Sequence, residues 1–230
     1  MNIKNYVISA QQAFMAAVLV LSLLVSTFFM VEPKIGQAVD SGPFTIKQTI
    51  DGEISFLVDA PNVVMSGSLN GVTGGTANGT STAVVTTNSS TGYTMSIAFF
   101  DNAGDSAMYG DTTFSDAIQD YASTSEPSYG FSTASSAAVF AFTASADNTS
   151  DVDLSFNDDG SSCNSAGSVN PGTCWRGPTV SGFQIIDRST SANTGATTTI
   201  NFRVHVPNSP SPAVVTDTYT ATATLTAVNQ

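Results

Sequence analysis

The chain is 230 residues long and carries a formal net charge of −12, although only 10% of its residues are charged. A chain of this length can bury one sizeable hydrophobic core. The negative field repels phosphate backbones and anionic lipid surfaces, so nucleic acid is excluded as an expected partner. Membrane contact is expected only through the apolar residues 13–31.

The N-terminus has the layout of an export signal. Lys4 precedes the apolar run of residues 13–31, and Gly36-Gln37-Ala38 supplies a small-x-Ala cleavage site. The run is also long enough to cross a bilayer. Residues 1–38 are therefore either a signal peptide cleaved after Ala38 or a retained membrane anchor. Both alternatives place the remaining chain outside the cytoplasmic membrane, as a secreted or cell-surface protein.

Two stretches in the first hundred residues predict β-hairpins. Residues 44–58 alternate between polar and apolar side chains on both sides of Asp51-Gly52, which is a tight-turn signal. Residues 81–100 contain a β-branched run, then a break rich in Ser, Asn and Gly, and then a strict alternation from Tyr93 to Phe99.

The rest of the chain predicts more strands and one insertion. The acidic residues 101–126 are interpreted as a loop insertion with a short helical turn over residues 113–121. Further strands are expected over residues 137–144, 183–186, 197–206 and 217–228. The stripe Tyr93, Met95, Ile97 and Phe99 needs a facing apolar sheet, for which the best candidate is Ile200, Phe202, Val204 and Val206.

Eight or nine short strands with no long helix after residue 38 predict an all-β fold. The expected architecture is a single antiparallel β-sandwich over residues 39–230, immunoglobulin-like in layout and carrying the acidic insertion around residues 101–126. The last alternating strand either completes its own sandwich or pairs with the sheet edge of a neighbouring molecule.

Cys163 and Cys174 are the only cysteines, and an exported segment favours a disulfide between them. Trp175 follows directly. It is expected either to pack beside this bridge or to stack on a sugar ring.

Oxygen-rich side chains gather in one later loop. Asp151, Asp153, Asp158 and Asp159 are candidate calcium ligands, although their spacing does not match an EF-hand and acidic loops are also commonly just solvated. No other metal site and no cofactor are expected.

The sequence offers no catalytic constellation. His205, the single histidine, is expected to face solvent on the side of its strand opposite Val204 and Val206. No Gly-x-Ser-x-Gly elbow accompanies it. The expected protein is therefore not an enzyme.

Several segments resemble uncharacterised exported proteins of candidate-phyla (Patescibacteria-type) bacteria. These segments are residues 44–50, Thr86-Thr87-Asn88 with Gly92-Tyr93-Thr94-Met95, Cys163 with Cys174-Trp175, and Pro210-Ser211-Pro212-Ala213 with Asp217-Thr218-Tyr219. This resemblance implies no activity. More remotely, Gly92-Tyr93-Thr94-Met95 and residues 219–226 are similar to WxL-type surface domains, which attach non-covalently to cell walls. Here Trp175 is followed by Arg176-Gly177, so the signature Trp-x-Leu is missing and wall binding is not carried over.

Together these features predict an exported structural or adhesive protein of a bacterial cell surface, whose expected partner is either a second copy of itself or a cell-wall or surface glycan. The alternative is a module that binds glycans or cell-wall polymers through Trp175 and loop tyrosines such as Tyr109, Tyr121 and Tyr129.

Overall fold

The computed structural model describes residues 3–30, 45–101, 106–122, 126–131, 136–165 and 167–230. The chain divides into two compact units, Met1–Thr49 and Ile50–Gln230. The predicted cleavage site after Ala38 lies outside the described residues.

The first unit contains one apolar helix, α1 (Ile3–Met30). At about 1.5 Å per residue its 28 residues span about 42 Å, which exceeds the hydrocarbon core of a bilayer. The window Ala10–Thr27 is long and apolar enough to cross a membrane. The hydroxyls of Ser22 and Ser26 donate to carbonyls one turn earlier, so they need no partner outside the helix. A signal sequence and a single-span anchor share these properties.

The second unit, Ile50–Gln230, is built from β-strands. Its largest sheet has seven strands, in the order β1 (Ile54–Val58), β2 (Gly75–Thr87), β10 (Ala192–Val206), β7 (Val139–Ala146), β5 (Ala117–Asp120), β4 (Met108–Gly110) and β11 (Tyr219–Ala221). A three-stranded sheet has the order β12 (Ala223–Asn229), β3 (Tyr93–Phe99) and β9 (Phe183–Arg188). A third sheet pairs β6 (Ser128–Tyr129) with β8 (Cys174–Trp175), and two short 3₁₀ turns cover Thr149–Asp151 and Leu154–Phe156.

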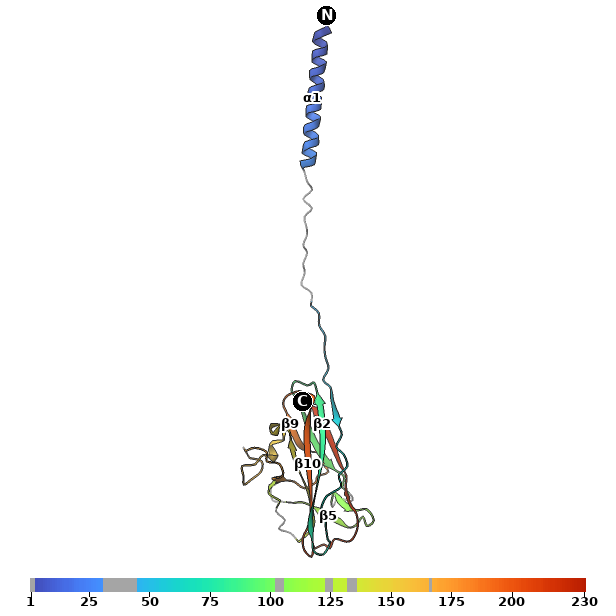
Figure 1. Cartoon of the computed structure of the whole chain (residues 1–230), viewed down its shortest axis with the longest axis vertical. Coiled ribbons are helices and arrows are strands. Elements are labelled where there is room, and N and C mark those ends of the chain that lie inside the picture. Colours follow the sequence, from blue (N-terminus) through green and yellow to red (C-terminus); the bar gives the residue numbers. More distant parts are fainter. Residues whose placement is uncertain (1–2, 31–44, 102–105, 123–125, 132–135, 166) are drawn as a thin grey trace. The chain divides into compact units, whose positions relative to one another are not determined.

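The long strands β2 and β10 are neighbours in the large sheet and run side by side for most of their length (Figure 1). β5 and β7 are parallel, whereas every other pair of described strands is antiparallel. The prediction of a purely antiparallel fold is therefore wrong. The parallel strand comes from residues 101–126, so this stretch is more than a loop. The helical turn predicted over residues 113–121 is also wrong, because Ala117–Asp120 is extended and paired with β4 and β7.

The inner faces of the two larger sheets share one hydrophobic core. Val85 of β2, Met95 and Ile97 of β3, and Ile200 and Val204 of β10 are at most 1% exposed. The Tyr93–Phe99 stripe and the apolar face of β10 belong to this one core, and the Phe99 ring contacts Phe140 and Phe142 of β7. The strands expected around residues 137–144, 183–186 and 197–206 are present as β7, β9 and β10.

The hairpin predicted for residues 81–100 is wrong. β2 pairs with β1 and β10, while β3 pairs with β12 and β9. The chain therefore crosses from one sheet to the other between Thr87 and Tyr93. Both strands bury one face almost completely, and stacking these faces across the core removes more apolar surface from water than edge pairing would.

The hairpin predicted for residues 44–58 is also wrong. Phe44 lies outside the described residues, and none of the described residues 45–53 belongs to a strand. β1 instead pairs with β2. The strand expected over residues 217–228 is divided at Thr222, so that β11 completes one edge of the large sheet and β12 lies in the three-stranded sheet.

Candidate binding site

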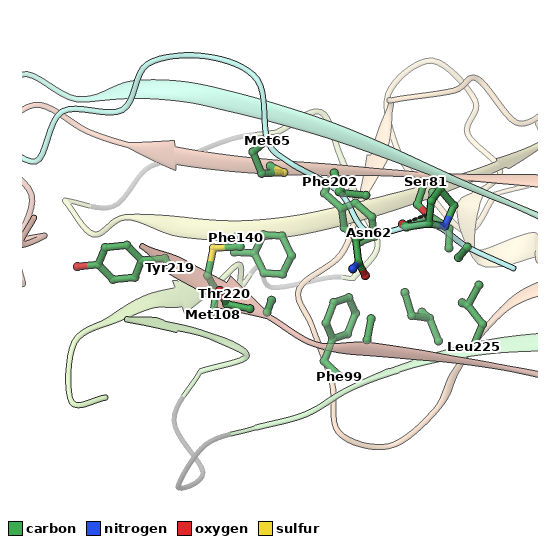
Figure 2. Close-up of a pocket in the computed structure, with 17 residues that line it drawn as sticks. Asn62, Met65, Ser81, Phe99, Met108, Phe140, Phe202, Tyr219, Thr220 and Leu225 are labelled. Carbon is green, nitrogen blue, oxygen red and sulfur yellow. Dashed lines mark hydrogen bonds between the residues drawn. The ribbon is translucent and has the colours of Figure 1, made fainter. Parts of the chain in front are cut away.

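A cavity of about 230 Å³ lies between the two larger sheets (Figure 2). Phe140 and Phe202 stack with ring centroids 6.1 Å apart, and Phe99 meets Phe140 edge-on at 5.9 Å. Ile97, Ile200 and Met108 complete the deep part of the lining, and Leu225 of β12 stands at its side. The lining is thus assembled from strands far apart in the sequence.

Residues 60–65, which follow β1, form another wall of this cavity. The Ser81 hydroxyl donates to the Pro61 carbonyl at 2.9 Å, and this bond fixes the segment against β2. Gly79 makes the approach possible, because a Cβ there would collide with the Val63 side chain and come within 2.6 Å of Met65 Sδ. Figure 2 shows the Asn62 side chain pointing from this segment into the space between Phe202 and Phe99.

The lining combines aliphatic and aromatic side chains with the Asn62 amide and the hydroxyls of Ser81, Thr220 and Tyr219. It contains no carboxylate, imidazole, thiol or amine, and the Tyr219 hydroxyl already donates to the Val215 carbonyl at 3.1 Å. Asn62 makes no side-chain hydrogen bond to the described residues. An apolar cavity of about 150 Å³ can hold a benzene-sized group. This cavity is therefore suited to one or more aliphatic side chains accompanied by a polar group that meets Asn62.

β12 borders the cavity and is an edge strand, since within the described sheets it pairs only with β3. The Phe100 amide donates to the Thr222 carbonyl, and the Gln230 amide donates to the Gly92 carbonyl. In an antiparallel ladder, hydrogen-bonded and non-bonded residue pairs alternate. The backbone groups of Ala223, Leu225 and Ala227 therefore point to the open side of β12.

The predicted disulfide between Cys163 and Cys174 is confirmed, with Cα atoms 5.9 Å apart. Trp175, beside it, is only 2% exposed. Its Nε1 donates to the Gly172 carbonyl, the Arg203 guanidinium lies 4.3 Å from the ring and Phe131 meets it edge-on. Because the indole is covered on its faces and edge, it has no room for a sugar ring. The stacking role proposed for Trp175 is therefore corrected to a packing role, which the sequence had left open.

The four candidate calcium ligands do not converge. Asp151 forms an ion pair with Arg188, and Asp153 accepts hydrogen bonds from the Ser155 amide and the Gln184 side chain. Asp158 accepts from Asn170 Nδ2 and from the Gly160 amide.

Asp159 accepts hydrogen bonds from Ser161 and Ser162, and these bonds lower the pKa of its carboxyl to about 2. No group of three His, Cys, Asp or Glu side chains able to hold a metal occurs in the described part of the chain. The four carboxylates thus bind donors of the protein itself, two of which, Arg188 and Gln184, lie on β9, and the structure does not gather them into one site.

His205 lies, as expected, on the side of β10 opposite the buried Val204 and Val206. Its Nδ1 is 2.9 Å from the Thr76 hydroxyl on β2. On the same side of the strand, burial lowers the pKa of Arg203, which also donates from Nε to the Asn78 side chain. No nucleophile accompanies His205 in these contacts. This outer face of the sheet is a packed polar–aromatic layer.

The residues that define the cavity were missed by the sequence interpretation. No element is predicted for residues 60–65, and Asn62 is not among the predicted site residues. A usable signal was present in Val63-Val64-Met65, an apolar run too short for a strand and directly followed by a glycine-rich stretch. Comparison with protein-family models, with curated proteins and with solved structures finds no match for this chain.

Proposed function

We propose that this protein is an exported, non-catalytic structural component of a bacterial cell surface. The observation that carries the proposal is the order of its parts. A helix able to enter a membrane precedes an acidic, disulfide-bonded β unit. A disulfide persists in oxidising compartments outside the cytoplasm.

We further propose that the β unit is a sandwich with an immunoglobulin-like layout. The shared core between the seven-stranded and three-stranded sheets supports the two-layer arrangement. The outer side of β12 carries Thr224 and Thr226, both exposed, and hydroxyl side chains of this kind solvate a strand without adding charge. Such a rigid, hydroxyl-rich unit with few lysine and arginine residues offers few sites to trypsin-like proteases, as a surface component requires.

Fractionation of cells expressing the full chain with a C-terminal epitope tests this proposal. The protein is expected in the membrane, wall or medium fraction, and added protease should reach the epitope in intact cells. The N-terminal mass distinguishes cleavage after Ala38 from retention of α1. Recovery of a protease-inaccessible protein from the cytoplasm would overturn the proposal. Specific retention of the native protein on isolated wall material would instead favour the alternative, a wall-polymer-binding module.

A further inference from the structure

The residues that lead into the β unit have the sequence pattern of a strand, although they form none in the structure. Residues 45–50 alternate in the sequence, with Ile46, Gln48 and Ile50 on one face and Thr45, Lys47 and Thr49 on the other. Ile46 and Ile50 are each 82% exposed. Residues with this alternation favour an extended, half-buried strand. Among the described residues, however, no strand pairs with this segment.

Hydrogen bonds with Asn88 fix the residues just before β1. The Asn88 side chain donates to the Asp51 carbonyl and accepts from the Glu53 amide, and the Asn88 amide donates to the Glu53 carbonyl. These bonds continue the β1–β2 ladder by one step beyond Ile54. Residues 51–53 are thereby held in line with β1. A reversal of the chain that placed Ile50 over the same β unit would have to break these hydrogen bonds.

The open side of β12 is a matching acceptor. The free backbone groups of Ala223, Leu225 and Ala227 line it, and the cavity opens beside Leu225. An added strand places every second side chain towards the core. Ile46, Gln48 and Ile50 would then present an apolar, polar, apolar face to a cavity whose lining places the Asn62 amide and a few hydroxyls among aliphatic and aromatic side chains.

We propose that residues 45–50 of one copy add as a strand to the open edge of β12 in a second copy. Ile46 and Ile50 face the cavity, and the Gln48 amide meets Asn62. Each copy offers one donor segment and one acceptor edge, so the contact is head-to-tail and can propagate along a chain of molecules. This inference rests on the proposed surface function, since it names the partner that a structural component assembles with.

Cysteine crosslinking in the full chain tests the contact directly. Two copies with different tags are co-expressed, one carrying Ile46→Cys and the other Leu225→Cys. Mild oxidation is expected to yield a crosslinked species that carries both tags. Lys47→Cys in place of Ile46→Cys is the matched control, because the neighbouring residue points away from the cavity, and it should crosslink at least tenfold less. A crosslink within a single chain would overturn the proposal, because the segment would then complete its own sheet.

A second pair of variants distinguishes the effect of the strand face that is changed from the effect of the added negative charge. Ile46→Asp/Ile50→Asp is expected to leave only monomers in light scattering. Thr45→Asp/Thr49→Asp adds the same charge to the opposite face and should retain assembly. These side chains are exposed, so both variants should keep the melting temperature of the wild type. Equal loss of assembly in both variants, or a wild type that stays monomeric at high concentration, would overturn the inference.

Two outcomes distinguish this inference from the proposed function. A surface-exposed protein that remains monomeric contradicts strand addition alone. A crosslinked protein confined to the cytoplasm contradicts the surface function alone. Native mass spectrometry of the wild type adds a third outcome: a small apolar molecule bound to a monomer would assign the cavity to that ligand and overturn strand addition.

Discussion

At the scale of single residues, Asp120 is a carboxyl group whose position makes stability depend on pH. Burial raises the pKa of Asp120 to about 6, nearby Asp101 and Glu126 add to the rise, and a hydrogen bond from the Ala107 amide opposes it. The ordinary pKa of an aspartate in an unfolded chain is about 4. Between these values the folded chain holds a proton that the unfolded chain has lost. This bound proton stabilises the folded chain. Its contribution to the free energy of unfolding is complete below about pH 4 and is lost as the pH rises through 6.

Asp120→Asn is thus expected to stabilise the protein at neutral pH, since it removes the charge while keeping an oxygen for the Ala107 amide. The gain in the free energy of unfolding should be about 1 kcal/mol at pH 7.5, allowing for solvent screening, and should vanish near pH 4. Urea unfolding at the two pH values measures it. Asp59→Asn, an exposed residue, is the control for a change in net charge alone. A gain of the same size at both pH values would contradict the assignment.

The ion pair between Asp151 and Arg188 contrasts with Asp120, because each of its two charged side chains compensates the charge of the other. The two side chains are only 10% and 18% exposed, and Arg188 also donates to the carbonyls of Thr190 and Ser191. Removing one member of a buried pair leaves the other charge poorly compensated. Asp151→Ala should lower the free energy of unfolding by about 3 kcal/mol. Asp159→Ala, on an exposed turn, should cost much less in the same denaturant titration, and equal losses would count against a special role for the pair.

At the scale of elements, the crossing between β2 and β3 depends on Gly92. Its φ is +83°, and a Cβ there would collide with the Arg188 carbonyl. Gly160 has a similar φ of +89°, but nothing lies within 4 Å of its added Cβ. Gly160→Ala should therefore cost about 1 kcal/mol through backbone strain alone. Gly92→Ala should cost about 3 kcal/mol or more, because β9 must also shift. Thermal unfolding measures the loss of stability in both variants. Similar losses would show that the close approach of Gly92 to β9 does not add to the cost of the substitution.

Local patterns predicted individual elements better than their partners. The alternation of Tyr93, Met95, Ile97 and Phe99 correctly predicted a strand with one buried face. The five residues before it have the composition of a hairpin loop, but loop composition cannot distinguish edge pairing from a crossing between sheets. Whether the chain forms a hairpin or crosses between sheets depends on β10 and β12, which follow about a hundred residues later in the sequence. The same limit applies to β5. Its parallel pairing with β7 depends on how the strands are arranged in the sheet, which residues 117–120 alone do not determine.

At the scale of the whole molecule, the candidate site was hardly predictable. The apolar face of β10 was expected to be buried, and Phe202 belongs to it. The cavity nevertheless also requires β12 to leave one side open and Asn62 to reach across from residues 60–65. Both depend on the relative position of two sheets, which no spacing in the sequence encodes. The disulfide was predictable because only two cysteines exist. The packing of Trp175 against Arg203 was not, because these residues are 28 positions apart on different strands.

Disulfide formation links the proposed export of the whole molecule to its stability. Cys163 and Cys174 are 11 residues apart, and closing a loop of this size stabilises the folded chain by on the order of 3 kcal/mol. For a protein of this size that corresponds to a fall in melting temperature of about 6–12 °C when the bond is removed. Cys163→Ala/Cys174→Ala should show this fall, while a reductant should lower the melting temperature of the wild type but not of the variant. In cells, thiol alkylation before lysis should leave both cysteines of the exported protein unmodified. Alkylation of both cysteines in the exported protein would contradict an oxidising compartment, and a wild type insensitive to reductant would contradict the energetic role of the bond.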